Sequence, residues 1–211
     1  MVSTLALAIL SAPNWSAGNT WQYTLTTQYQ NANTNFSEEE SFNLALVTKR
    51  SDGYDFKVTR KLQATIVDGT RVPTAAGVTG ETFDAKYNVA GQLTDWNLAS
   101  NPVESRFQRI LIGCSLPSPV KRYETRLTES AGIPTAYIVA DRNPQFRELI
   151  YDFSYRELPE TKILGSFELT PQFPLPKKMI ARIERIQIPG GSEFASCTLT
   201  LALKQDKIDK S

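Results

Sequence analysis

The sequence of 211 residues contains no histidine, and this absence removes several classes of active site. Histidine is the usual proton shuttle near neutral pH and the commonest metal ligand among side chains. Without it, Ser-His-Asp and Cys-His nucleophilic sites cannot form, and neither can histidine-ligated zinc, copper or non-haem iron sites. We therefore expect no cofactor and a non-enzymatic protein. The alternative is an unusual enzyme that works with carboxylates, lysine or tyrosine.

Cysteine is also scarce, with only Cys114 and Cys197 in the chain. In an oxidising compartment these two residues could form a disulfide, whereas reduced thiols would pack as small apolar side chains. Cys197 alternates with Leu199, Leu201 and Leu203, which predicts that its side chain points inward. Sequence alone cannot place Cys114 beside it, so both readings stay open.

Neither sign of charge is in excess, because 23 lysines and arginines balance 22 acids to a net charge of +1. Such a chain lacks the basic footprint of nucleic-acid binding and the basic cluster that holds an anionic membrane surface. We therefore expect no nucleic-acid partner. Long apolar runs are missing too. The run Leu5–Leu10 is too short to cross a bilayer, so we expect no transmembrane segment.

The same apolar run is followed by the small residues Ser11 and Ala12, as at the end of a secretory signal. A basic region before the run is missing, and Pro13 is a poor residue directly after a cleavage point. We expect residues 1–12 to be either a residual signal or an apolar lead-in that packs on the domain. The signal reading predicts a periplasmic or secreted, extracytoplasmic protein.

Two-residue alternation is abundant in the chain, and it is longest from Tyr54 to Val67. Successive side chains on a strand point to opposite faces, so this pattern predicts one strand with a dry face and a wet face. At about 3.3 Å per residue it would span roughly 45 Å, although strands usually have about five or six residues. Turns are expected on either side, at Ser51–Gly53 and Asp68–Gly69. Strands of this length are typical of large, curved antiparallel sheets.

Similar alternation predicts further strands at about 20–29, 42–48, 83–89, 123–127, 135–140, 149–155, 163–169, 180–188 and 194–203. In the strand at 180–188, Ile180, Ile186 and Ile188 are expected to share a face with Arg182 and Glu184. The polar stretch from Asn31 to Glu40 is expected to be a loop. We expect residues 13–203 to form a single β domain, followed by a polar tail at 204–211.

One amphipathic helix is expected between two groups of strands. Asn101 suits the N-cap and Pro102 the first helical position, while Gly113 suits the C-terminal stop. Within the helix, one face carries Val103, Phe107, Ile110 and Leu111. Because only the sheet can cover that face, the predicted fold is mainly β: a curved antiparallel half-barrel with this helix on its concave side. A closed barrel is the alternative, and a sandwich is third.

Aromatic residues are the most informative candidates for a site. Their default role is core packing. The alternative is an apolar cavity between sheet and helix that accepts a lipid-like ligand, with Trp96 and the helix as a lid. The residues we expect to line such a site are Trp21, Tyr23, Phe56, Trp96, Phe107, Tyr151, Phe153 and Tyr155.

The layout of these elements resembles the bacterial lipoprotein-carrier fold, the LolA and LppX type. The stretch that carries the resemblance is Phe146 to Leu203, including the proline-rich segment Phe173–Ile180, and Trp21 after Gly18 resembles a Gly-x-x-Trp opening seen in secreted bacterial proteins. The chain differs from the carriers in lacking a second clear helix. The resemblance implies a cell-envelope or secreted protein that binds an apolar or lipid-like ligand. The alternative is a scaffold or interaction module with a filled core.

Overall fold

The computed structural model describes residues 13–33, 35–72, 80–96, 107–108, 110–111, 124–130, 133–141, 149–158, 161–170, 172–187 and 192–207. Twelve strands in this part of the chain form one sheet. Their bounds are β1 Thr20–Gln30, β2 Asn35–Lys49, β3 Gly53–Val67, β4 Thr70–Val72, β5 Glu81–Asn88, β6 Leu93–Trp96, β7 Glu124–Ser130, β8 Ile133–Asp141, β9 Leu149–Leu158, β10 Thr161–Leu169, β11 Lys178–Gln187 and β12 Phe194–Lys207.

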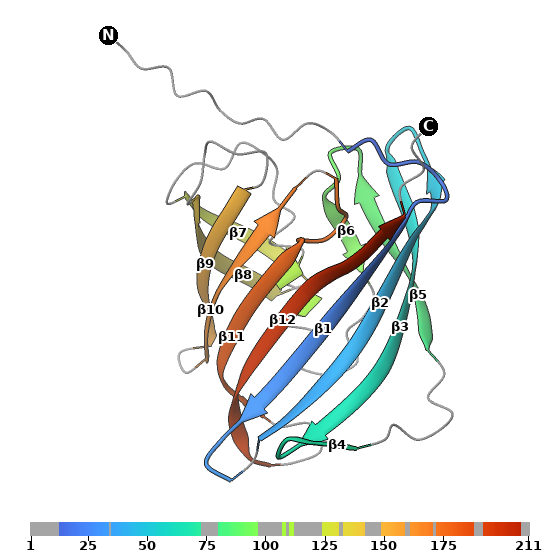
Figure 1. Cartoon of the computed structure of the whole chain (residues 1–211). Helices are drawn as coiled ribbons and strands as arrows, with labels where there is room; N and C mark the ends of the chain where they lie inside the picture. The colour runs from blue at the N-terminus through green and yellow to red at the C-terminus, as the bar shows by residue number, and fades with distance from the viewer. Residues whose placement is uncertain are drawn as a thin grey trace.

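Every strand pairs antiparallel with its neighbours, in the order β6-β5-β3-β2-β1-β12-β11-β10-β9-β8-β7, and β4 pairs with the far end of β3. The sheet is long and strongly curled, as Figure 1 shows. The half-barrel architecture predicted from the alternation is therefore confirmed. Since β6 and β7 stand at opposite ends of the order, the strand pairing of the described residues is that of an open sheet rather than a closed barrel.

The strands β1 and β12 lie side by side in the middle of the sheet, although they come from opposite ends of the described chain. Their pairing joins an N-terminal half, β1 to β6, to a C-terminal half, β7 to β12. Within each half, most neighbouring strands follow one another in the sequence, as hairpins require.

The core lies on the concave face of the sheet, and alternation explains which residues reach it. In β3, Tyr54, Phe56 and Val58 are buried as predicted, and in β12 Cys197, Leu199 and Leu201 are completely buried. The inward direction predicted for Cys197 is therefore confirmed. Cys114 lies outside the described residues, so the disulfide stays a prediction.

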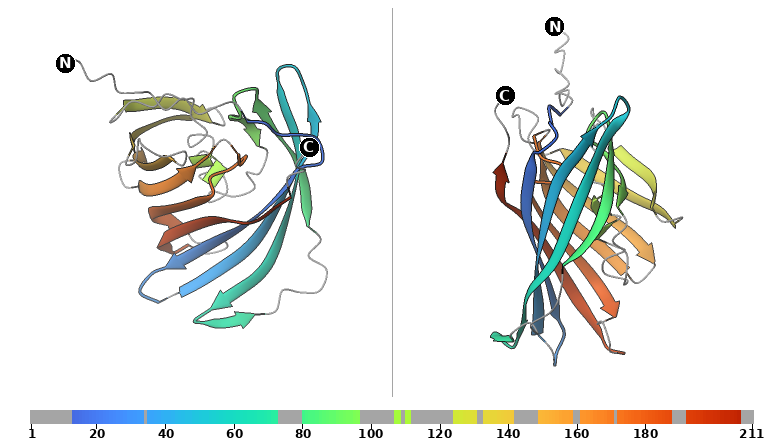
Figure 2. Two further views of the ribbon diagram at one scale, coloured as in Figure 1. Left: turned by 45° about the horizontal axis from the view of Figure 1, so that its top comes forward. Right: turned by 90° about the vertical axis from the view of Figure 1, so that its right-hand side faces the viewer.

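The described part of the expected helix is helical and belongs to the same core. Phe107, Ile110 and Leu111 are all buried in the cluster that the sheet contributes. The segment, drawn in yellow-green, lies within the curve of the sheet (Figure 2). Val103, Asn101 and Gly113 lie outside the described residues.

The loop expected at Asn31–Glu40 is wrong over its second half, because β2 already begins at Asn35. Two interactions across the sheet compensate for the polar composition of this segment. The ring of Phe36 stacks on Tyr29 with centroids 4.5 Å apart, and the Glu40 carboxylate pairs with Arg60 of β3. Tertiary partners therefore override the weak strand propensity of the acidic residues.

The shared face predicted in β11 is correct for Ile180, Arg182 and Glu184, which lie together on the exposed face, but wrong for Ile186, and Ile188 lies outside the described residues. Met179, Ala181 and Ile183 are buried, whereas Ile180 is 39% exposed and Arg182 and Glu184 are exposed. A bulge follows Ile183, where the register shifts and Arg185 takes a φ of 60°. Because a bulge inserts an unpaired residue, it reverses the alternation and brings Ile186 into the core.

The strand β12 continues past Leu203 to Lys207, and Thr20 pairs with Lys207. Four residues of the stretch expected as a polar tail thus extend the sheet, and their side chains are exposed.

Candidate functional site

One end of the concave face is closed by the segment that precedes β1. Trp15 lies there, with edge-on contacts to the rings of Trp21, Tyr54, Phe56 and Tyr87 at centroid distances of 5.9, 5.0, 5.6 and 5.5 Å. Edge-to-face pairs at these distances add stability beyond the burial of apolar area. We call Trp15 and these four rings the aromatic cap.

Two hydrogen bonds hold this segment in place. The Tyr54 hydroxyl donates to the carbonyl of Pro13 at 3.0 Å, and the Trp15 indole Nε1 donates to the carbonyl of Gln172 at 3.1 Å. Gly91 allows the close approach, because a Cβ atom there would lie 2.8 Å from Pro13 Cγ. The segment therefore fits between the β5–β6 turn and the β10–β11 connection.

The β10–β11 connection closes the same end from the other side, where Pro174, Leu175 and Pro176 are buried. The Tyr23 hydroxyl donates to the Leu175 carbonyl at 3.1 Å and accepts from the Leu175 amide at 3.4 Å. Burial raises the pKa of Tyr23 far above its ordinary value, while the backbone hydrogen bond with Leu175 opposes the rise. Tyr23 is therefore neutral, and its hydroxyl holds the β10–β11 connection through two hydrogen bonds with the backbone of Leu175.

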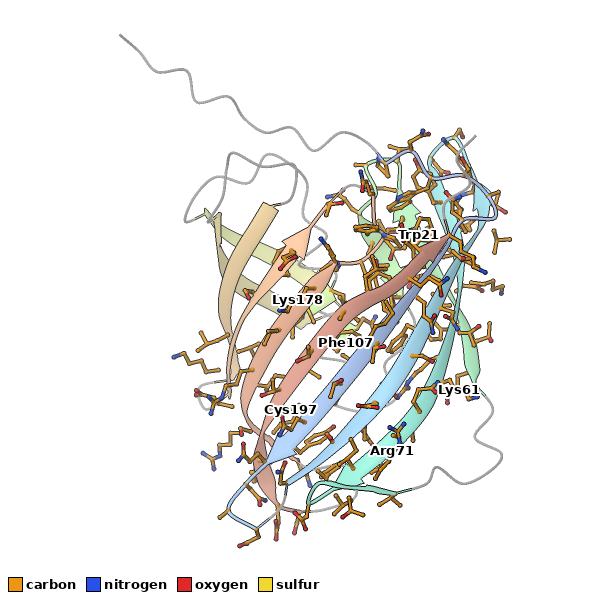
Figure 3. All side chains as sticks on the ribbon, in the orientation of Figure 1. Trp21, Lys61, Arg71, Phe107, Lys178 and Cys197 are labelled. Carbon is orange, nitrogen blue, oxygen red and sulfur yellow. The ribbon has the colours of Figure 1, made fainter. Side chains whose placement is uncertain are left out.

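Several other polar atoms in this interior have no hydrogen-bond partner. Four such atoms are buried without a partner: the indole nitrogens of Trp21 and Trp96, the hydroxyl of Tyr87 and Oε1 of Gln108. Burial, together with the nearby Tyr23, raises the pKa of Tyr87 well above its ordinary value. Figure 3 shows Trp21 near the end of the sheet that the aromatic cap closes.

These polar atoms share one concave face. Trp21 lies against Phe56, with ring centroids 5.7 Å apart, and Phe56 lies 4.8 Å from Tyr87. Phe56 also pairs with Ala85, which pairs in turn with Trp96. Trp21 and Tyr87 therefore lie on either side of Phe56, and Trp96 lies two strands away on the same face, where its ring contacts Phe42 and Phe83 at centroid distances of 6.0 and 5.6 Å.

A charged pair lies farther along the same face. Arg60 Nη2 is 2.6 Å from Glu40 Oε1, and Arg60 Nη1 is 3.5 Å from Glu81 Oε2. The register places Glu40 opposite Leu25 and Arg60 opposite Phe42, both of which are core residues. Since opposite residues of a pleated sheet share a face, this ion pair interrupts an otherwise apolar concave surface.

The structure brings together five of the residues expected to line a ligand site. Trp21, Tyr23, Phe56, Trp96 and Phe107 are almost completely buried in one core cluster. Phe107 lies farther than Trp21 from the end of the sheet that the aromatic cap closes, as Figure 3 shows. Trp96 is in strand β6, within the core, rather than in a lid over it.

The other three expected residues are in β9, whose side chains are outside the described part. Their backbone register is described: Tyr151, Phe153 and Tyr155 pair with Phe167, Gly165 and Ile163 of β10.

No pattern in the sequence predicted the roles of Trp15, Leu175 and the Glu40–Arg60 pair. Trp15 has no alternating neighbours to mark it as a core residue, and a tryptophan just before a strand is the only sequence signal. The partners of Leu175 and Glu40 depend on pairing across the sheet, which no local pattern specifies.

In the ranges that the structure describes, no three cysteine or acidic side chains gather in a way that could hold a metal ion. No helix in these ranges has the length and apolar character needed to cross a bilayer. No family model matches the sequence, and no curated protein matches it either.

Proposed function

We propose that this protein is a non-enzymatic, extracytoplasmic binding protein whose concave face holds an apolar or lipid-like ligand. The observation that carries the proposal is the set of buried, unpartnered polar atoms on Trp21, Tyr87 and Trp96. Native proteins pair nearly all buried polar atoms, so each exception calls for an explanation.

Leaving these buried polar atoms without partners destabilises the folded protein. A buried donor without an acceptor costs about 1–3 kcal/mol, and a whole domain is stable by only about 5–15 kcal/mol. Phenylalanine would fill the same space without this cost. A molecule seated among Trp21, Tyr87 and Trp96 that brought acceptor atoms would recover it, and the surrounding aromatic rings would cover its apolar part.

Two features of the sequence agree with this proposal. The layout resembles the lipoprotein-carrier fold, in which a curved sheet encloses an apolar ligand, and the described helical residues Phe107, Ile110 and Leu111 pack in the core on the concave side. The apolar run at residues 5–10 favours a periplasmic or secreted location.

Native mass spectrometry of the protein purified from its own host tests the proposal. We expect an adduct of lipid-like mass that disappears when the protein is denatured in organic solvent. Trp15→Phe serves as a control, because the Trp15 nitrogen already has Gln172 as its partner and this variant should keep the adduct. A clean mass for the unmodified chain, together with an empty organic extract, would overturn the proposal.

A second candidate function is a scaffold or interaction module with a completely filled core. The dense packing of the aromatic cap favours it, because Trp15 contacts four rings at once. The same experiment separates the two candidates, since a filled core leaves no room for an adduct.

A further inference from the structure

We infer that the ligand is uncharged and carries an acceptor oxygen of the ester or ketone type, which it presents to the indole nitrogens of Trp21 and Trp96. This inference rests on the proposed function and names the chemical class of its ligand.

The direction of the unpartnered groups requires acceptors from the ligand. An indole nitrogen can only donate a hydrogen bond, so Trp21 and Trp96 cannot satisfy one another. The Tyr87 hydroxyl, which is also without a partner, can donate or accept. A pure hydrocarbon supplies no acceptor, so both indole nitrogens would still lack a hydrogen-bond partner.

The neighbouring hydroxyl cannot take the place of the ligand. Tyr23 belongs to the same core cluster as Tyr87, but its hydroxyl is already engaged with the amide and carbonyl of Leu175. Neither indole nitrogen has the Tyr23 oxygen within hydrogen-bond reach, so the indoles need an acceptor from elsewhere.

The charge on the concave face disfavours an anionic acceptor such as a carboxylate. On this face Arg60 is paired with the acids Glu40 and Glu81, and the exposed Lys49 lies over the Tyr54 ring, with its Nζ 5.8 Å from the ring centroid. Glu38 lies on the same face, opposite Thr27. A carboxylate buried beside Arg60 would meet the carboxylates of Glu40 and Glu81, with which Arg60 is already engaged, and burying an unpaired charge is strongly unfavourable. An uncharged oxygen meets the indoles without this penalty.

The experiment compares three probes with the purified full chain: methyl laurate, pentadecane with the same number of heavy atoms, and laurate at pH 8. Each probe displaces the uncharged fluorophore N-phenyl-1-naphthylamine, and the dissociation constants are compared. We expect methyl laurate to bind about tenfold more tightly than pentadecane, as roughly one or two recovered hydrogen bonds predict, and more tightly than laurate.

Matched variants assign the preference to the indoles. In Trp21→Phe/Trp96→Phe, the ester should bind no better than pentadecane, while pentadecane itself still binds. Trp15→Phe makes the same chemical change at an indole that already has a partner, so it should keep the preference.

Each outcome has a distinct meaning. If laurate binds as tightly as the ester, the ligand is not restricted to uncharged molecules and the inference is overturned, while the proposed function stands. Equal affinity of the wild-type chain for the ester and for pentadecane overturns it as well, because the indoles then take no part in recognition. If none of the three probes binds, the proposed function itself fails.

Discussion

The hydroxyl of Tyr23 donates a hydrogen bond to the carbonyl of Leu175 at 3.1 Å, across 152 residues of sequence. This contact fixes the β10–β11 connection to β1 inside the core. It also explains why the connection can be buried at all, since its backbone needs partners away from water.

Tyr23→Phe is therefore expected to lower the free energy of unfolding by about 1–2 kcal/mol, because the Leu175 carbonyl and amide lose a buried partner. Urea denaturation of lipid-free protein, followed by circular dichroism, measures the loss. Tyr87→Phe is the control, since its hydroxyl has no partner and its removal should leave stability unchanged or raise it. Equal losses in both variants would contradict this account of the Tyr23 hydroxyl.

Alkaline pH is expected to destabilise the protein. Burial raises the pKa values of Tyr23 and Tyr87 above the ordinary 10.0, so the folded state keeps protons that the unfolded state releases. The stabilisation is complete below about pH 10 and falls as pH rises, by roughly 1.4 kcal/mol per pH unit for each tyrosine.

Urea midpoints between pH 8 and pH 11.5 measure this slope. In Tyr87→Phe, the loss of unfolding free energy per pH unit should be smaller by the contribution of one tyrosine, roughly 1.4 kcal/mol. A slope that did not change in this variant would show that Tyr87 ionises equally in both states.

Gly91→Ala is expected to destabilise the protein more than Gly69→Ala. The two glycines have nearly the same φ, 78° and 79°, so the backbone cost of adding a side chain is alike. A Cβ atom at Gly91 would lie 2.8 Å from Pro13 Cγ, whereas a Cβ atom at Gly69 meets nothing within 4 Å.

The difference between the two variants isolates the contact with the segment before β1. We expect it to be about 1–3 kcal/mol, the usual cost of overpacking. Thermal unfolding of both proteins gives the comparison, and identical melting temperatures would mean that this segment is not packed against the β5–β6 turn.

Glu40→Gln is expected to lower the free energy of unfolding by about 2–4 kcal/mol, because it leaves the Arg60 guanidinium half-buried without its closest carboxylate. Asp84→Asn is the matched control in the same sheet. Asp84 pairs with Lys57 at 2.6 Å, but the two side chains are 65% and 55% exposed. An exposed pair contributes less than about 1 kcal/mol.

Denaturation at low and at 0.5 M salt checks both values. The loss in Glu40→Gln should be nearly independent of salt, since a pair shielded from solvent is screened little. Similar small losses in both variants would show that Glu40 does not offset the cost of burying the Arg60 guanidinium.

The sequence predicted the strands well where one face of a strand is buried and the other is exposed to solvent. The alternation from Tyr54 to Val67 predicted β3 almost to the residue, and the turn residues Asp68 and Gly69 lie where a hairpin needs positive φ. Prediction failed where a distant partner decides the structure. Asn35 to Glu40 is polar but becomes part of β2, since Tyr29 and Arg60 supply the missing stabilisation.

The candidate site was only partly predictable for the same reason. Alternation marked Trp21, Tyr23 and Phe56 as inward-facing, and all three are buried. It could not distinguish the Tyr23 hydroxyl, which has partners, from the Trp21 nitrogen, which has none. That difference depends on the path of residues 172–177, more than a hundred positions away in the chain.

The central pairing of β1 with β12 has a consequence for how the protein is made. While the ribosome is still working on the C-terminal half, β1 has its finished neighbour β2 on one side and an open edge on the other. An open edge can recruit a strand from another nascent chain. Only when residues up to about Lys207 have left the exit tunnel can the two halves of the sheet join, because β12, the last of the described strands, pairs with β1 in the middle.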